Sequence, residues 1–242
     1  MENSNVKELL GAVNDLGEKF NDFTEVLKNF AENYNANTDA KPTMKLEDLI
    51  VKRTIEMKTS EYQEGDIISF ELTDGEKVEA IAVKEESDGM VFILSDCLKD
   101  EYEMFEDVDC IDRDKICYEE SDLRKKLNGK ILDRFPDYIK SKLKPMQIGN
   151  TDKFDLLRIP TEKEIFGKNE YGKDEGNVEQ FEIMKLRKNR IASEGLNGTY
   201  QWYWLQNKVK SSAAGFADVD TNGGSDYGGA SNSSGVRPLF KI

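Results

Sequence analysis

Three runs near the end of the chain decide the fold. Residues 201–205 read QWYWL, residues 214–220 read AGFADVD, and residues 235–242 read GVRPLFKI. Aromatic and β-branched residues in short runs bounded by small polar residues predict strands. In the last run every second residue is apolar, so one face is expected to lie on a core. Pro238 inside this run predicts an edge strand or a bulge.

The two tryptophans of the chain fall in the first of these runs. Trp202 and Trp204 are two residues apart, so both indoles are expected to point to the same side of a strand. Large aromatic side chains usually bury their area, which favours a core role over stacking on a sugar. We therefore predict that Trp202, Trp204, Val236 and Phe240 share one core.

Strands and helices alternate upstream of these runs. Residues 67–72, 78–83 and 90–94 predict strands, and the Asp-Gly pairs at residues 74–75 and 88–89 predict the turns between them. Residues 119–143 predict a helical stretch with Ser121 as its N-cap. Residues 154–160 predict a short strand, followed at Thr161 by a helix start of the capping-box type. This mixture predicts an α+β domain.

Four motifs in a fixed order carry a family resemblance. They are ESDLRKKLNG at residues 120–129, LLRIPTE at 156–162, WYWL at 202–205 and GVRP at 235–238. This order resembles a domain family common in phages and gut bacteria, and the resemblance covers residues 62–242. It implies a C-type lectin-like fold, similar to formylglycine-generating enzymes and to the variable proteins of diversity-generating retroelements. What it implies about function is a scaffold used for binding, although a shared fold does not establish a shared function.

A polar segment separates the last two strands. Residues 218–234 consist almost wholly of Asp, Asn, Ser, Thr, Gly, Ala and Tyr, which is the composition of an adaptable binding surface. A flexible loop without a ligand is the alternative. If the segment recognises a ligand, strand alternation predicts an exposed ligand-binding face formed by Tyr203, Asn207, Asp220, Asn222, Asp226, Tyr227, Asn232 and Ser233.

Residues 218–223 read DVDTNG, which matches the first half of a calcium-binding loop. Gly229 stands where such a loop carries its bidentate glutamate. Asn222-Gly223 is equally a signal for a type I′ hairpin turn. We favour the hairpin and predict neither a metal nor another cofactor.

The N-terminal segment has the most regular periodicity. Apolar residues recur alternately at spacings of three and four from Val6 to Tyr34, with Phe20 and Phe23 among them, which predicts a coiled coil over residues 1–34. The alternative is an amphipathic helix docked on its own domain. Residues 35–61 predict a linker and a short helix. The expected organisation is thus a self-associating helix, with a trimer favoured by the bulky phenylalanines, a linker, and a domain over residues 62–242.

Composition excludes several classes of function. The 242 residues include 34 Lys and Arg against 48 Asp and Glu, a formal net charge of −14, which disfavours nucleic acid and anionic membranes as partners. The absence of histidine excludes the commonest general base and metal ligand. Three scattered cysteines and no apolar N-terminal run predict synthesis in the cytoplasm without a signal peptide or membrane insertion, with a virion as an alternative destination.

These observations predict a non-catalytic protein, encoded by a phage or prophage, that recognises a cell-surface protein or glycan. The alternative is a structural virion component, such as a decoration or assembly protein, without a specific ligand. An enzyme is the third interpretation, since carboxylates are abundant but no pair stands out.

Overall fold

The computed structural model describes residues 62–149 and 151–242. The chain divides into two compact units, Met1–Met57 and Lys58–Ile242, and every described residue belongs to the second. The expected coiled coil over residues 1–34 and the linker over residues 35–61 lie outside the described residues. Within the second unit, strands and short helices are mixed, so the α+β class is confirmed.

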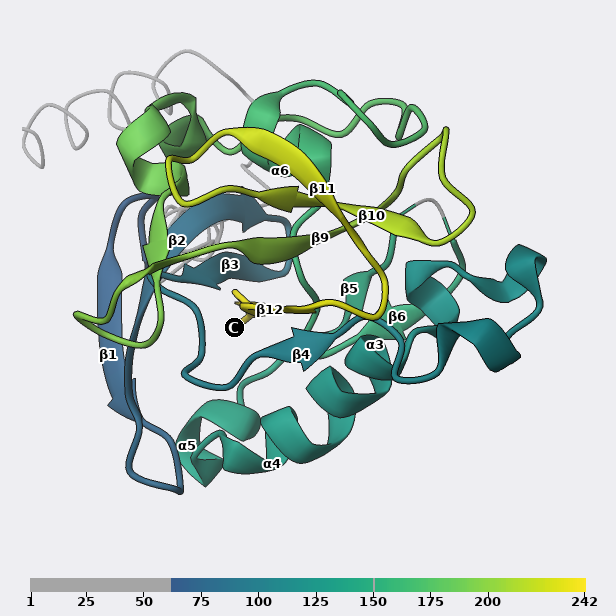
Figure 1. Cartoon of the computed structure of the whole chain (residues 1–242). Coiled ribbons are helices and arrows are strands. Elements are labelled where there is room, and N and C mark those ends of the chain that lie inside the picture. The colour runs from purple at the N-terminus through teal and green to yellow at the C-terminus, as the bar shows by residue number, and fades with distance from the viewer. Residues whose placement is uncertain (1–61, 150) are drawn as a thin grey trace, which may run out of the picture. The chain divides into compact units, whose positions relative to one another are not determined.

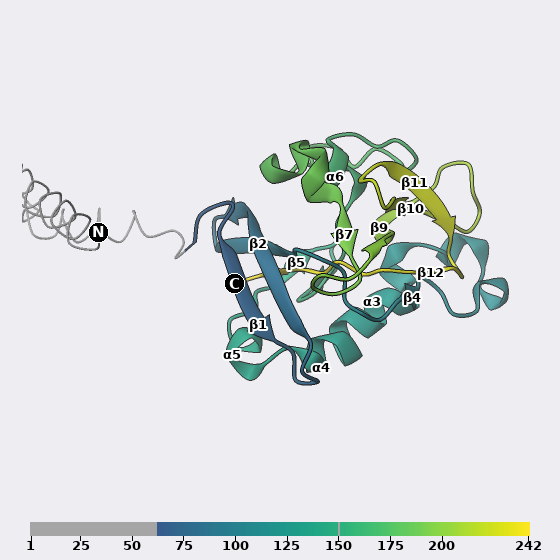
Figure 2. The same ribbon diagram turned by 60° about the vertical axis from the view of Figure 1, so that its left-hand side comes forward.

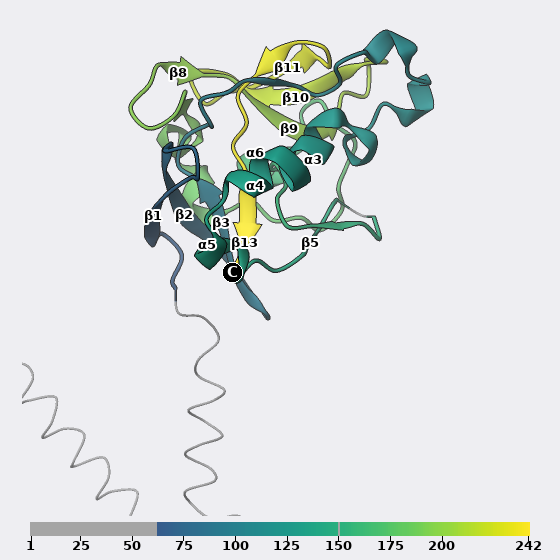
Figure 3. The same ribbon diagram turned by 90° about the horizontal axis from the view of Figure 1, so that it is seen from below.

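A four-stranded antiparallel sheet contains both the first and the last described strands. Its order is β1-β2-β3-β13, with β1 Ile67–Glu71, β2 Lys77–Glu86, β3 Gly89–Leu94 and β13 Leu239–Lys241. The predicted meander is therefore confirmed. Strand β13 forms an edge of this sheet directly after Pro238, as the proline predicted. Figure 3 shows β13 beside β3 at the middle of the domain.

A second sheet holds the aromatic and polar runs. Its order is β11-β10-β9, with β9 Tyr203–Lys208, β10 Gly215–Val219 and β11 Ser225–Gly229, and it lies above the first sheet in Figure 1. Three two-stranded pairs complete the strands: β12 Ser233–Ser234 with β4 Tyr102–Glu103, β5 Met146–Gln147 with β6 Phe154–Asp155, and β7 Ala192–Ser193 with β8 Tyr200–Gln201.

The helices are short and begin where the sequence predicts. The Ser121 side chain accepts the backbone N–H of Arg124 as an N-cap, and Thr161 and Glu164 form the expected capping box. Phe135 is extended because Pro136 follows it, and this ends the first helical stretch. The α-helices are α3 Asp122–Lys126, α4 Leu132–Arg134, α5 Asp137–Lys140 and α6 Glu162–Phe166, with a π-helical segment at Leu127–Ile131. Single 3₁₀ turns occur at Val108–Cys110, Arg113–Lys115, Tyr118–Glu120, Glu182–Lys185 and Arg187–Arg190.

Helices α3, α4 and α5 lie on the opposite side of the domain from the β9–β11 sheet (Figure 2). Trp204, Val236 and Phe240 belong to one hydrophobic cluster, as expected. The prediction that Trp202 joins them is wrong, because this side chain is 41 % exposed. Trp202 lies between the end of β8 and the start of β9, so strand alternation does not continue through it to Trp204.

Candidate functional site

Two of the eight predicted surface residues are buried, so the expectation that they are exposed is wrong. Tyr203 is fully buried: its hydroxyl donates to the carbonyl of Arg190 at 2.9 Å, and Arg237 donates to it at 3.3 Å. Asn207 is buried too, and its Oδ1 accepts the backbone N–H of Glu162 at 2.7 Å. Strand β9 packs against neighbours on both of its faces, so its polar residues bond within the protein.

The other six do not share one element. Asp226 and Tyr227 lie on β11, which has no outer neighbour among the described strands, and Asp220 and Asn222 lie in the turn between β10 and β11. Asn232 directly precedes β12, and Ser233 lies in β12, which pairs with β4. Asp226 is paired with Asp218 in the register of β10 and β11. Tyr227 is half-exposed and packs against Tyr171, with ring centroids 5.0 Å apart. Adjacent residues of a strand point to opposite faces, so Asp226 and Tyr227 do not share the single face that we predicted. The six residues are Asp220, Asn222, Asp226, Tyr227, Asn232 and Ser233.

The DVDTNG motif forms the turn between β10 and β11. Oδ1 of Asp220 accepts the backbone N–H groups of Asn222 and Gly224, both at 2.7 Å. Gly223 has φ of +73°, whereas Asn222 has negative φ, so the turn is a three-residue loop with a left-handed glycine and is not of type I′. The Asp220 carboxylate, which would be a ligand in a calcium loop, is thus already hydrogen-bonded to the backbone of the turn. In the chain segments that the structure covers, no three Asp, Glu or Cys side chains are placed to hold a metal ion.

Asp218 is a buried acid that sequence reasoning missed. It is 4 % exposed on the central strand β10, and its Oδ1 has no hydrogen-bond partner among the described residues. Burial raises its pKa to about 7, and the negative charges of Asp226 and Asp220 contribute to the same shift. In the sequence Asp218 looked like part of a polar loop, and only the pairing of β10 on both sides places it in the interior.

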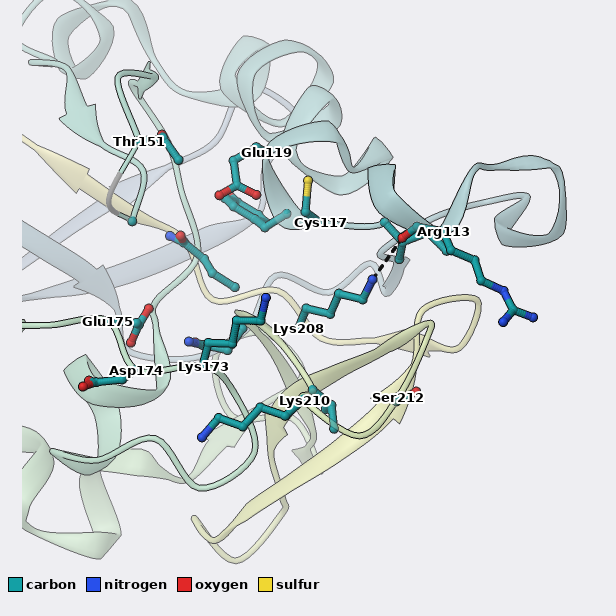
Figure 4. A pocket seen from close by; sticks show the side chains of 16 residues that line it. Arg113, Cys117, Glu119, Thr151, Lys173, Asp174, Glu175, Lys208, Lys210 and Ser212 are labelled. Atoms are coloured by element: carbon teal, nitrogen blue, oxygen red, sulfur yellow. Dashed lines mark hydrogen bonds between the residues drawn. The ribbon is translucent and has the colours of Figure 1, made fainter.

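A cavity of about 660 Å³ lies between four segments of the domain (Figure 4). They are residues 113–119, the turn that contains Gly149 and Thr151, residues 173–175, and residues 206–212 at the end of β9. Its volume falls in the range of about 300–1,000 Å³ typical of small-molecule sites. Of the eight predicted residues, Asn207 alone lines this cavity.

A network of buried polar groups fixes one wall of the cavity. The carboxylate of Glu162 accepts the backbone N–H groups of Glu170, Tyr171 and Gly172 at 3.2, 3.0 and 2.7 Å. A Cβ at Gly172 would lie 2.6 Å from both the Glu162 carboxylate and the Asn207 Cβ, so only glycine fits there. This network holds the segment around Gly172 against β9. Lys173 is the next residue in the chain, and it lines the cavity.

The middle of the cavity is lined by amides. Gln206 is 7 % exposed, and its Nε2 donates to the carbonyl of Ile159 at 2.6 Å. Its backbone N–H donates to the carbonyl of Pro160 at 3.0 Å. Asn207 is held by the backbone N–H of Glu162, which donates to its Oδ1. Both side chains are thus fixed in place before any ligand arrives.

Charged residues line the cavity on more than one side, and Asp174 and Glu175 lie beside Lys173 (Figure 4). Lys173, Lys208 and Lys210 lie together on one side, and Glu119 lies across from them (Figure 4). Glu175 borders the cavity as well, and burial raises the pKa of its carboxyl. We call the three lysines the lysine wall.

Cys117 also lines the cavity. Burial raises the pKa of its thiol, and a hydrogen bond to Glu119 raises it further. A nucleophilic cysteine needs a lowered pKa, because the thiolate is the reactive form. The surroundings of Cys117 therefore favour an inert thiol.

The structure carries no candidate membrane span: from residue 62 onward, the described helices are all too short and too polar to cross a bilayer. No curated protein and no solved structure is detectably similar to the chain. The sequence pattern of one family, described as a domain of unknown function (DUF6273), matches residues 88–242. The match runs from the turn before β3 to the end of β13 and includes every segment that lines the cavity. The chain therefore belongs to the DUF6273 family.

Proposed function

We propose that the domain is a non-catalytic recognition module. It holds a polar ligand, or the polar end of a larger one, in the cavity that is lined by Gly149, Thr151 and residues of the segments 113–119, 173–175 and 206–212. The observation that carries this proposal is the fixed amide lining. Gln206 and Asn207 are buried, bonded to the backbone, and still border the cavity. Polar groups that are fixed in advance cost little free energy to order on binding.

The chemistry around the cavity suits binding better than catalysis. The chain contains no histidine, and the Cys117 thiol is kept in its protonated form. Glu119, Asp174 and Glu175 are the carboxyl side chains of the lining that could act as acid or base, and for this reason the test below includes the recovery of reaction products.

The resemblance from the sequence motifs adds the biological setting to the proposal. It suggests a lectin-like scaffold of a phage or prophage protein that recognises a cell surface, similar to the variable proteins of diversity-generating retroelements. The six other predicted residues, in and around β11 and β12 and at least partly exposed, would then contact the parts of a large ligand that extend beyond the cavity. A trimeric coiled coil over residues 1–34 would add avidity to weak single-site contacts. A structural virion component is the alternative.

The test is to probe the full chain on an array of bacterial and animal glycans, with two matched variants. Lys173→Trp places an indole in the cavity, and Lys142→Trp removes the same charge and adds the same ring at an exposed position elsewhere. We expect wild type and Lys142→Trp to bind the same glycans and Lys173→Trp to lose them. The ligand released on denaturation should have an unchanged mass.

Three outcomes would contradict the proposal. Cleaved ligand would indicate an enzyme. Binding that survives Lys173→Trp but is lost in Tyr227→Ala would move recognition to the β11 edge. If the wild type bound no glycan on the array, the structural virion component would be the interpretation that remains.

A further inference from the structure

We infer that this cavity selects an anionic ligand, a carboxylate or phosphate carried on a hydroxyl-rich body such as a sugar acid or a sugar phosphate. The inference rests on the proposed function and names the class of ligand for the same cavity. It is carried by the grouping of the three lysines on one side of the cavity, with Glu119 across from them (Figure 4). The amides of Gln206 and Asn207 line the same cavity next to Lys208 on β9.

The lysine wall forms no ion pair with a described carboxylate. No described Asp or Glu oxygen lies within 4.0 Å of the ammonium nitrogen of Lys173, Lys208 or Lys210, although the chain has 48 acidic residues against 34 basic ones. The neighbouring acid on the same segment, Asp174, is bound instead by Lys163, with Nζ and Oδ1 2.5 Å apart. Within the described residues, none of the three ammonium groups is therefore taken up by an ion pair, although the hydrogen bond from Lys163 and, to a smaller extent, the charge of Lys210 lower the pKa of Asp174.

The backbone fixes these lysines close together. Lys208 and Lys210 are two residues apart near the end of β9, and Lys173 is held beside them because Gly172 pairs with Val209 as an isolated antiparallel bridge. Lys208 also donates from its ammonium group to the carbonyl of Arg113 at 3.1 Å, across the cavity. Like charges held together repel, and an anion bound between them would offset that repulsion.

The rest of the lining is suited to hydroxyl groups. Glu119 offers a carboxylate across the cavity from the lysine wall, and Gln206 and Asn207 add side-chain amides. Carboxylates and amides accept hydrogen bonds from hydroxyl groups. One ligand can therefore place its anionic group on the lysine wall and its hydroxyl groups on the remaining sides.

The charge of the whole chain limits the size of the anion. With a net charge of −14, the surface outside the cavity repels extended polyanions such as nucleic acids. A compact ligand with one or two charges avoids this repulsion, because its charge lies within the cavity.

The experiment is a titration of the full chain with D-glucuronate, D-glucose 6-phosphate and D-glucose, followed by calorimetry and by amide NMR shifts. The three sugars share a hexose body and differ in the anion, so they also separate a carboxylate from a phosphate ligand. We expect both anions to bind at least tenfold more tightly than glucose, with shifts centred on residues 173–175 and 206–212. Raising the salt concentration should weaken the binding of the two anions and leave the binding of glucose unchanged.

Matched double variants assign the preference to the wall. Lys173→Gln with Lys210→Gln should abolish the tenfold preference. Lys142→Gln with Lys188→Gln removes the same charge from exposed lysines elsewhere and should keep it. All four positions are exposed, so folding should change by no more than about 0.5 kcal/mol per site.

Equal binding of all three sugars in the cavity would overturn the inference that the ligand is anionic, and it would leave the proposed function intact. The class would also fail if neither anion shifted the cavity residues, or if the preference survived in the Lys173→Gln and Lys210→Gln variant. Failure of the proposed function is seen separately, on the glycan array.

Discussion

Asp218 and Asp226 are directly opposite each other in the antiparallel register of β10 and β11, and Asp218 is the one removed from solvent. Burial raises the pKa of Asp218 to about 7 from an ordinary value of 3.8. Between these values the folded state keeps a proton that the unfolded state releases. Stability is therefore lost as the pH rises from about 4 through about 7.

Asp218→Asn should remove this pH dependence. At pH 8 the variant should be more stable than wild type by up to about 4 kcal/mol, because the buried charge is gone. At pH 4 the difference should be small, since this pH is close to the ordinary value of 3.8 and the unfolded carboxyl has only begun to gain from releasing its proton. Urea denaturation at the two pH values measures both quantities. An equal effect of Asp218→Asn at both pH values would contradict the prediction.

The two tryptophans should differ sharply in their contribution to stability. Trp204 is fully buried, and its indole N–H donates to the carbonyl of Tyr102 at 2.7 Å. Trp204→Ala should cost about 3–5 kcal/mol of unfolding free energy. Trp202→Ala should cost less than about 1 kcal/mol, since its side chain is 41 % exposed. Denaturant titration followed by circular dichroism checks both, and similar losses would contradict the assigned burial.

Gly223 should tolerate substitution less well than Gly75. Both have positive φ, +73° and +89°, which costs an L-residue about 1–2 kcal/mol. A Cβ at Gly223 would also lie 2.7 Å from the carbonyl oxygen of Arg187, whereas a Cβ at Gly75 meets nothing within 4 Å. Gly75→Ala thus measures the cost of the positive φ alone. Gly223→Ala should lower the thermal unfolding temperature by a larger amount than Gly75→Ala does. Equal losses would mean that the Arg187 backbone moves freely.

Self-association through residues 1–34 stays a prediction. Sedimentation of the full chain at micromolar concentration should show a trimer or another multimer. Phe20→Asp with Phe23→Asp should dissociate it, because both residues lie in the apolar seam. A monomeric wild type would exclude the coiled coil.

Local signals in the sequence predicted much of the fold. The Asp-Gly turns of the meander, the Ser121 N-cap and the Thr161 capping box each depend on a few neighbouring residues, and each is present. Pro238 likewise predicted the edge position of β13. These features are set by short-range backbone chemistry, which a sequence displays directly.

The site was predicted poorly because it depends on long-range packing. Alternation predicts an exposed face only where a sheet has solvent on one side, and β9 and β10 have neighbours on both. Tyr203 and Asn207 are buried for this reason, and so is Asp218. The cavity joins four segments that are far apart in the chain, and only the lysines at residues 208 and 210 could have indicated it.

The position of β13 has a consequence for how the protein is made. Among the described strands, the edge of β3 that presents Val91, Phe92 and Ile93 is paired by β13, Leu239–Lys241. At a synthesis rate of about 5–20 residues per second, the ribosome needs roughly 7–30 s to translate from one strand to the other. During that interval a nascent apolar strand edge is open to pairing with other chains, the situation in which aggregation competes with folding. Slower growth at low temperature, or chaperones that shield nascent chains, should therefore affect the yield of folded protein more strongly than its final stability suggests.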